Sequence, residues 1–195
     1  MLQQLWVQAL NSTTLKINNI KGANYRSFFV WYKSCKTFIK YNMKNNVLRI
    51  VSVILPIVLV SVLGSIFVNL GMDWFNGLNK PTQWIPNWVI PVVWTVIYIT
   101  FAVVLLRWSS KEEVPTSTKI LLIANGILNI LWCLIFFTLK LTFVGNIVIL
   151  LNLIAGIALW VNIFLQKRNY AYWLAIYPIW LSIATTLNLA LWILN

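Results

Sequence analysis

Residues 88–106 read WVIPVVWTVIYITFAVVLL, an apolar run that contains no charged side chain. A helix that crosses a membrane needs about 20 consecutive, mostly apolar residues, and this run supplies them. Four further runs of the same kind lie at 47–70, 120–139, 143–165 and 172–194. We therefore predict an all-α membrane protein, a bundle of five transmembrane helices.

The composition supports the same class. Of the 195 residues, 61% are hydrophobic and only 9% are charged, whereas soluble domains carry roughly 25% charged residues. The formal net charge is +12, and no acidic residue precedes Asp73. Such a basic balance could indicate nucleic acid. The cationic stretch adjoins an apolar span, however, so we expect membrane lipid as its partner and no nucleic acid.

Lysine and arginine residues near the span ends predict the orientation, because cytoplasmic loops are enriched in them. Lys80 and Lys140 flank one side of the predicted bundle. The other side carries Lys44, Arg49, Arg107, Lys111, Lys119, Lys167 and Arg168. We expect the N-terminus inside and the C-terminus outside. A bacterial inner membrane is the first choice of location, and the mitochondrial outer membrane is the alternative.

Residues 1–42 form a basic, polar N-terminal extension with interspersed aromatic residues. It is either an interfacial or targeting segment, or it is not translated. In the second case translation begins at Met43. Under both interpretations the transmembrane domain comprises residues 43–195.

The residues of ordinary catalysis are missing. There is no histidine, and the only acids are Asp73, Glu112 and Glu113, none of which lies deep in a span. The two cysteines, Cys35 and Cys133, show no disulfide or metal spacing. We predict no metal site, no conventional catalytic constellation and no ion-coupled transport.

Three predicted spans carry polar or aromatic stripes at helical spacing. The second has Trp94 and Tyr98. The third has Asn125, Asn129, Trp132 and Phe136, and the fifth has Trp173, Tyr177, Trp180, Ala184, Leu187 and Asn188. These stripes either pack the helices together or line a cavity for a large planar molecule. Trp108 and Trp173, near span ends, are interpreted as residues of the interfacial aromatic belt.

The loop before the second span reads WFNGLNKPTQWIPNW at 74–88. Its start, Trp74-Phe75-x-x-Leu78-x-Lys80-Pro81, resembles the WYxxLxKP stretch of the TspO/MBR family. Three later stretches resemble further family motifs: VWTVIY at 93–98, NGILNILW at 125–132 and IYPIWLSIATTLN at 176–188. The resemblance covers the chain from about residue 47 to its end.

The resemblance implies a five-helix bundle, usually a homodimer, that binds porphyrins such as protoporphyrin IX or a haem-like ring. Loop 74–88 would be the lid of the pocket, with Trp74, Pro81 and Trp84 among its contacts. Lys80 would pair with a propionate or serve as an exposed anchor. The pocket wall would comprise Phe75, Trp94, Tyr98, Asn129, Trp132, Trp180 and Ala184. To these we add Asn125, Leu187 and Asn188 from the stripes as candidate ligand-binding residues.

The sequence departs from the family pattern at two places. In the loop, Trp84 comes one position late and Ile85 replaces a proline, so the lid geometry differs. In the last span Ile176 replaces the usual proline and Pro178 follows two residues later, which should move the helix kink. The sterol-recognition stretch is absent after Leu187.

Three functions remain open at this stage. The first is a sensor or carrier of tetrapyrroles that stacks the ring between Trp94 and Trp180. The second is an enzyme that degrades porphyrin with light and oxygen, with Trp94 and Trp180 as its matching residues. The third is a membrane scaffold without a ligand.

Overall fold

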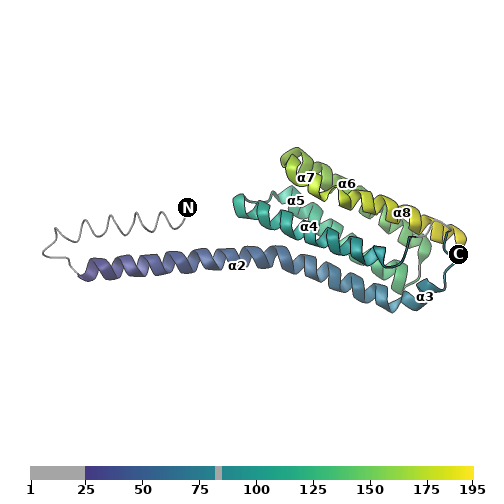
Figure 1. Cartoon of the computed structure of the whole chain (residues 1–195), viewed down its shortest axis with the longest axis horizontal. Helices are drawn as coiled ribbons and strands as arrows, with labels where there is room; N and C mark the ends of the chain where they lie inside the picture. The colour runs from purple at the N-terminus through teal and green to yellow at the C-terminus, as the bar shows by residue number, and fades with distance from the viewer. Residues whose placement is uncertain (1–24, 82–84) are drawn as a thin grey trace. The chain divides into compact units, whose positions relative to one another are not determined.

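The computed structural model describes residues 25–81 and 85–195, with side chains at 46–81 and 85–195. The chain divides into two units, Met1–Val47 and Leu48–Asn195, and the functional argument concerns the second. Figure 1 shows that the long helices of this second unit run along one common axis. No strand occurs among the described residues.

The helices follow one another with short connections. In chain order they are α2 (Tyr25–Leu70), α3 (Met72–Asn76), α4 (Val89–Lys111), α5 (Thr116–Cys133), the π-helix η1 (Leu134–Thr138), α6 (Thr142–Gln166), α7 (Arg168–Leu174) and α8 (Ile176–Leu194). Five segments of the described chain are long and apolar enough to cross a membrane: Asn46–Leu70, Val89–Lys111, Thr116–Thr138, Thr142–Gln166 and Arg168–Leu194. The prediction of an all-α bundle with five spanning helices is therefore confirmed.

The spans expose apolar side chains on the outside of the bundle and bury polar ones inside it, as expected for a protein in lipid. Large apolar side chains such as Leu165 and Ile193 are exposed on the outside of the bundle, whereas Asn125, Asn152 and Asn188 are at most 4% exposed. Lipid solvates apolar groups, but it cannot supply hydrogen bonds to amides. The polar side chains of the spans therefore turn toward one another.

The kink predicted near Pro178 is present as the break between α7 and α8 at Ala175. Proline has no N–H group, so Pro178 cannot donate to the carbonyl of Leu174 four residues earlier. The chain continues as a helix after the break, with Ile179 N donating to Ala175 O at 3.3 Å. The last span is thus divided into two helices three residues before this proline.

The π-helix η1 closes the third span. Its wider turn is seen in the bond from Leu139 N to Leu134 O at 2.9 Å. Two consecutive residues, Phe136 and Phe137, are both buried there. Their rings pack edge-to-face against each other with centroids 5.0 Å apart. Gly71, just before α3, lies directly against the backbone of Phe137.

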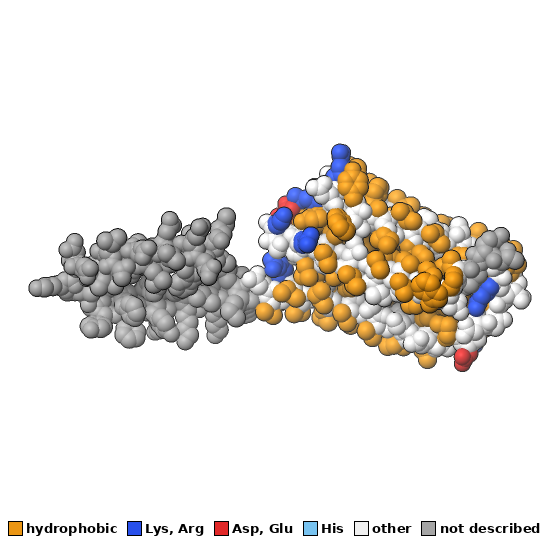
Figure 2. All heavy atoms as spheres, viewed as in Figure 1, with side chains coloured by type: hydrophobic (Ala, Val, Ile, Leu, Met, Phe, Trp, Pro, Cys, Tyr) orange, Lys and Arg blue, Asp and Glu red, His pale blue; other side chains and the backbone are white. Residues whose placement is uncertain are grey.

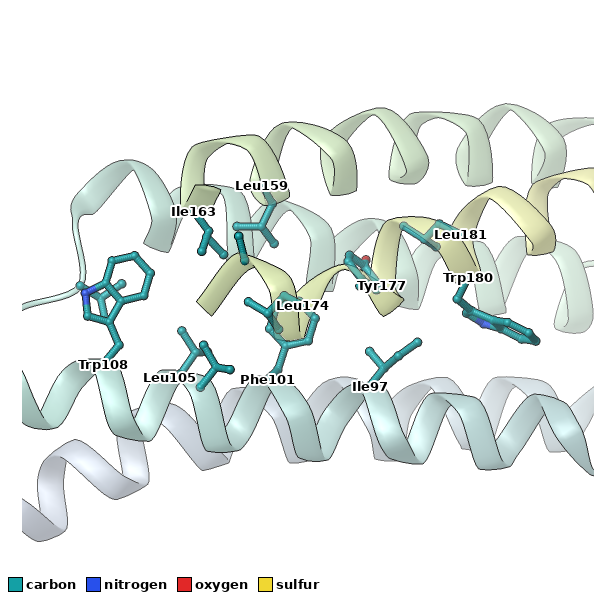
Figure 3. Close-up of a cluster of buried hydrophobic side chains, with 13 residues drawn as sticks. Ile97, Phe101, Leu105, Trp108, Leu159, Ile163, Leu174, Tyr177, Trp180 and Leu181 are labelled. Atoms are coloured by element: carbon teal, nitrogen blue, oxygen red, sulfur yellow. The ribbon is translucent and has the colours of Figure 1, made fainter. Parts of the chain in front are cut away.

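The interpretation of Trp108 as an interfacial residue is wrong. Its side chain is only 1% exposed and belongs to the buried cluster in Figure 3, with its ring 5.8 Å from that of Tyr170. Trp173, in contrast, is 71% exposed, as an interfacial residue should be. Nearness to a span end could not distinguish the two, because the break before α8 folds α7 over Trp108.

Charged side chains collect at the helix ends. Figure 2 shows the Lys and Arg groups gathered mostly at one end of the bundle. At that end Glu112 binds Lys167 at 2.6 Å, and Glu113 binds Lys119 at 2.8 Å. Both pairs lie in solvent, so they contribute little to stability. They tie the α4–α5 loop to the ends of its neighbouring helices.

Candidate functional site

Two clusters of buried apolar side chains fill the bundle, and Trp94 of α4 packs against both. The first cluster, drawn in Figure 3, lies where α4 faces α6, α7 and α8, and it includes Tyr177 and Trp180. The second joins α3, α5, η1 and α6, and it includes Phe75 and Trp132. Trp94 is therefore the side chain through which the two clusters meet.

Aromatic rings surround Trp94. Its indole stacks on Tyr98 with ring centroids 5.7 Å apart and an interplanar angle of 28°. Tyr177 presents an edge to it at 6.5 Å. Trp180 projects from α8 toward α4 (Figure 3), and its buried Nε1 has no hydrogen-bond acceptor among the described residues. A buried donor without an acceptor costs roughly 1–3 kcal/mol, so it is a natural point for ligand contact.

The short helix α3 brings the start of the predicted lid onto this aromatic group. Phe75 is buried, with its ring 5.2 Å from Phe137 and 6.5 Å from Phe136. Trp74 meets Phe136 edge-on at 5.7 Å. Lys80 places its Nζ 4.8 Å from the Phe75 ring centroid, a cation–π distance. A positive charge therefore lies at this end of the site.

The amide side chains of α5 and α6 meet Tyr177 inside the bundle. The Tyr177 hydroxyl donates to Asn125 Oδ1 at 3.0 Å and lies 3.4 Å from Asn152 Oδ1. Asn125 Nδ2 in turn donates to the carbonyl of Leu121 at 2.9 Å. Gly156 makes room for this group, since a Cβ there would lie 2.7 Å from Leu181 Cδ1.

A second polar chain crosses three helices. Trp132 Nε1 donates to Asn188 Oδ1 at 3.3 Å, and Asn188 Nδ2 donates to Asn146 Oδ1 at 2.8 Å. Asn129, one turn before Trp132, is 4% exposed and accepts a weak bond from Cys133 Sγ at 4.0 Å. The two polar chains and the rings around Trp94 together form what we call the candidate ligand site.

The loop after α3 is fastened to the end of α8. Asn79 N donates to Asn195 Oδ1 at 2.9 Å, and Asn195 Nδ2 donates to Asn79 O at 3.0 Å. The same Nδ2 also donates to Leu191 O at 2.8 Å. The side-chain amide of Asn195 thus bonds to both the N–H and the C=O group of Asn79.

The structure brings most of the predicted residues together. Trp84 lies outside the described residues. Pro81 and Leu187 are half-buried and belong to neither apolar cluster. The others are linked through the contacts above or through the second cluster: Trp74, Phe75, Lys80, Trp94, Tyr98, Asn125, Asn129, Trp132, Trp180, Ala184 and Asn188.

The sequence analysis missed the contribution of the fourth span. Asn146 and Asn152 of α6 bond to residues of the candidate ligand site, although no stripe was assigned to this helix. The signal was present. Residues at intervals of four and three form one buried face of α6: Gly145, Ile149, Asn152, Gly156, Leu159 and Ile163. It was overlooked because this face carries glycine and aliphatic residues rather than aromatic ones.

Known proteins show the family to which this arrangement belongs. A profile of the TspO/MBR family matches residues 52–193, which run from the first span to the end of the last. The chain belongs to the TspO/MBR family. Every residue of the candidate ligand site falls inside the matched region.

Three curated relatives agree with the family assignment. The tryptophan-rich protein TspO of Archaeoglobus fulgidus is 30% identical over 152 residues, which cover 77% of this chain and 99% of the relative. Protein CrtK of Rhodobacter capsulatus is 30% identical over 132 residues, covering 63% and 78%. The tryptophan-rich sensory protein of Cereibacter sphaeroides is 30% identical over 118 residues, covering 60% and 73%. As a TspO/MBR protein, this chain is a multi-pass membrane protein.

Proposed function

We propose that this TspO/MBR protein binds a planar tetrapyrrole, with a porphyrin as the ligand, and acts as its sensor or carrier. The observation that carries the proposal is the set of flat rings around Trp94, together with the buried indole N–H of Trp180 that has no acceptor in the described chain. Aromatic faces stack on a planar π-system, and the indole N–H can donate to its polar edge.

The surroundings suit such a ligand in their apolar surface and in their charge. Trp94, Tyr98 and Ala184 are only partly buried, so part of each surface is left for a ligand. The walls are apolar, with a few amide groups among them, as is typical of small-molecule sites. Lys80 on the Phe75 ring adds a positive charge that would attract a carboxylate.

The proposal also accounts for features that packing alone leaves unexplained. Packing gives the Trp180 N–H no acceptor, as it gives none to the buried Trp108 Nε1, but only Trp180 lies among the rings around Trp94. The family relationship supports a role for the tryptophans and a sensory function, because two relatives are named for their tryptophan content and one of them is called a sensory protein.

The test is a titration of the full chain with protoporphyrin IX in the dark, followed by the absorbance of the porphyrin itself. The critical variant is Trp94→Phe/Trp180→Phe. Its matched control is Trp88→Phe/Trp173→Phe, which removes two tryptophans that are 67% and 71% exposed. The porphyrin readout does not depend on how many tryptophans remain.

We expect saturable binding by the unchanged chain and the control. In the critical variant the affinity should fall about fivefold or more, because an indole hydrogen bond and part of two stacking faces are lost. Equal affinities for the two double variants would refute this site. Failure of the unchanged chain to bind would refute the porphyrin as its ligand.

A further inference from the structure

The polar chain from Trp132 through Asn188 to Asn146 has a fixed direction. An indole nitrogen can only donate a hydrogen bond. The Asn188 atom that faces Trp132 Nε1 at 3.3 Å must therefore be its oxygen, and its Nδ2 must point at Asn146. That Nδ2 in turn requires the oxygen of Asn146, which it meets at 2.8 Å.

The direction of these hydrogen bonds decides which atom is left without a partner at the Asn146 end. Because Asn146 turns its oxygen toward Asn188, its Nδ2 is left as the terminal donor. This nitrogen is buried and has no acceptor in the described chain. Reversing any one amide would place two donors or two acceptors face to face, so side-chain flips cannot relieve the terminal N–H. In a membrane, water is not freely available to satisfy it.

The terminal donor is the part of the candidate ligand site that lies on α6, near η1. Asn146 stands in the second turn of α6, at the end of the bundle where α3 packs on η1. Its neighbour Gly145 touches the Phe136 ring, since a Cβ at Gly145 would be 3.0 Å from Phe136 Cδ2. Phe136 contacts Phe75, and Lys80 lies over that ring. The backbone next to Asn146 and the cation of Lys80 thus both lie near the Phe75 and Phe136 rings.

We propose that Asn146 is a ligand-selecting residue, whose Nδ2 donates to a carboxylate or carbonyl oxygen carried at the edge of the planar ligand. Trp132 and Asn188 act as positioning residues that keep the amide of Asn146 turned with its nitrogen outward. The inference rests on the proposed function and adds to it a preference for ligands with an acceptor group. An all-hydrocarbon edge would leave the N–H unsatisfied and bind less well.

The experiment compares two porphyrins that share one ring system. Protoporphyrin IX carries two carboxyl groups, whereas etioporphyrin carries only alkyl groups. Both are titrated against the full chain, Asn146→Leu and Asn146→Ser, in micelles of a detergent without carbonyl groups. Asn162→Leu is the matched control, since it replaces an asparagine of the same helix that bonds to Thr118 and Gln166 instead. Size-exclusion profiles and thermal unfolding establish that each variant is folded.

We expect Asn146→Leu to weaken protoporphyrin IX binding about tenfold or more, the usual effect of losing a hydrogen bond to a charged group. Etioporphyrin binding should change less than twofold. Asn146→Ser should recover part of the loss, because its hydroxyl can accept from Asn188 and still donate. The Asn162→Leu control should bind both porphyrins as the unchanged chain does.

Three results would overturn the inference in different ways. Equal losses for both porphyrins would make Asn146 a packing residue. An unchanged affinity of Asn146→Leu for protoporphyrin IX would mean that a buried water or a lipid carbonyl, and not the ligand, satisfies the N–H group. A lipid carbonyl would be recognised if Asn146→Leu changed the affinity only in phospholipid nanodiscs. If the unchanged chain binds neither porphyrin, the proposed function itself fails, and the selectivity argued here fails with it.

Discussion

Gly71 offers the sharpest test of how the candidate ligand site is assembled. A Cβ built on Gly71 would lie 2.1 Å from the carbonyl oxygen of Phe137 and 2.5 Å from its carbonyl carbon. Carbon and oxygen atoms that are not bonded stay more than 3 Å apart, so one backbone segment must move by about 1 Å. Gly71 has a φ of −106° and a ψ of 4°, outside the left-handed region that favours glycine. The effect of Gly71→Ala is therefore purely steric.

The cost can be estimated from this geometry. Overpacking a core by a methyl group costs about 1–3 kcal/mol when side chains can yield. Here the contact is with backbone, so we expect about 3 kcal/mol or more. Gly77→Ala is the matched control. It lies at the other end of α3, where a Cβ would be in ordinary contact at 3.4 Å from Trp74 O and the backbone is right-handed. It should be neutral or slightly stabilising.

The assay is thermal unfolding of the two variants in detergent micelles, followed by the tryptophan signal and by the fraction that remains monodisperse. We expect a clearly lowered midpoint for Gly71→Ala and little change for Gly77→Ala. Displacing η1 also shifts Phe136 and Phe137, on which Phe75 rests, so porphyrin affinity should fall with stability. A Gly71→Ala protein as stable as the Gly77→Ala protein would refute the close packing of α3 on η1.

Three further predictions concern other contacts. Tyr177→Phe removes the hydroxyl bonded to Asn125, and should lower the unfolding free energy by about 1 kcal/mol; an effect no larger than that of the exposed Tyr172→Phe would contradict this. Asn195→Ala should speed hydrogen exchange at the Asn79 amide about tenfold, while the Gly77 amide, bonded within α3, stays as the internal reference. The hydrogen bond from Lys119 lowers the pKa of Glu113. The small stabilisation from this pair is therefore present above the ordinary pKa of a glutamate, and it is lost as the pH falls through the lowered pKa of Glu113. Lys119→Met should raise the pKa of Glu113 in an NMR titration.

The fold was predictable because membrane spans are long and nearly uniform. Each predicted span lies within a few residues of an observed one, and Pro178 located the break in the last span. The wide turn of η1 was not predictable. Nothing in LIFFT at 134–138 distinguishes a π-helix from an α-helix.

The candidate ligand site was predictable where its chemistry is distinctive and not elsewhere. Tryptophans and asparagines at helical spacing marked α4, α5 and α8. The contribution of α6 was missed because its regularly spaced buried face carries glycine and aliphatic residues rather than aromatic ones. The burial of Trp108 was missed because it depends on α7 packing against α4, a contact between segments far apart in the sequence.

The most direct test of the account is an experimental structure of the full chain with protoporphyrin IX bound. We predict ring density against the indoles of Trp94 and Trp180, with a carboxyl oxygen within hydrogen-bond distance of Asn146 Nδ2. Density for the ring on the lipid-facing surface of the bundle, with Trp94 and Trp180 packed as they are without ligand, would contradict it.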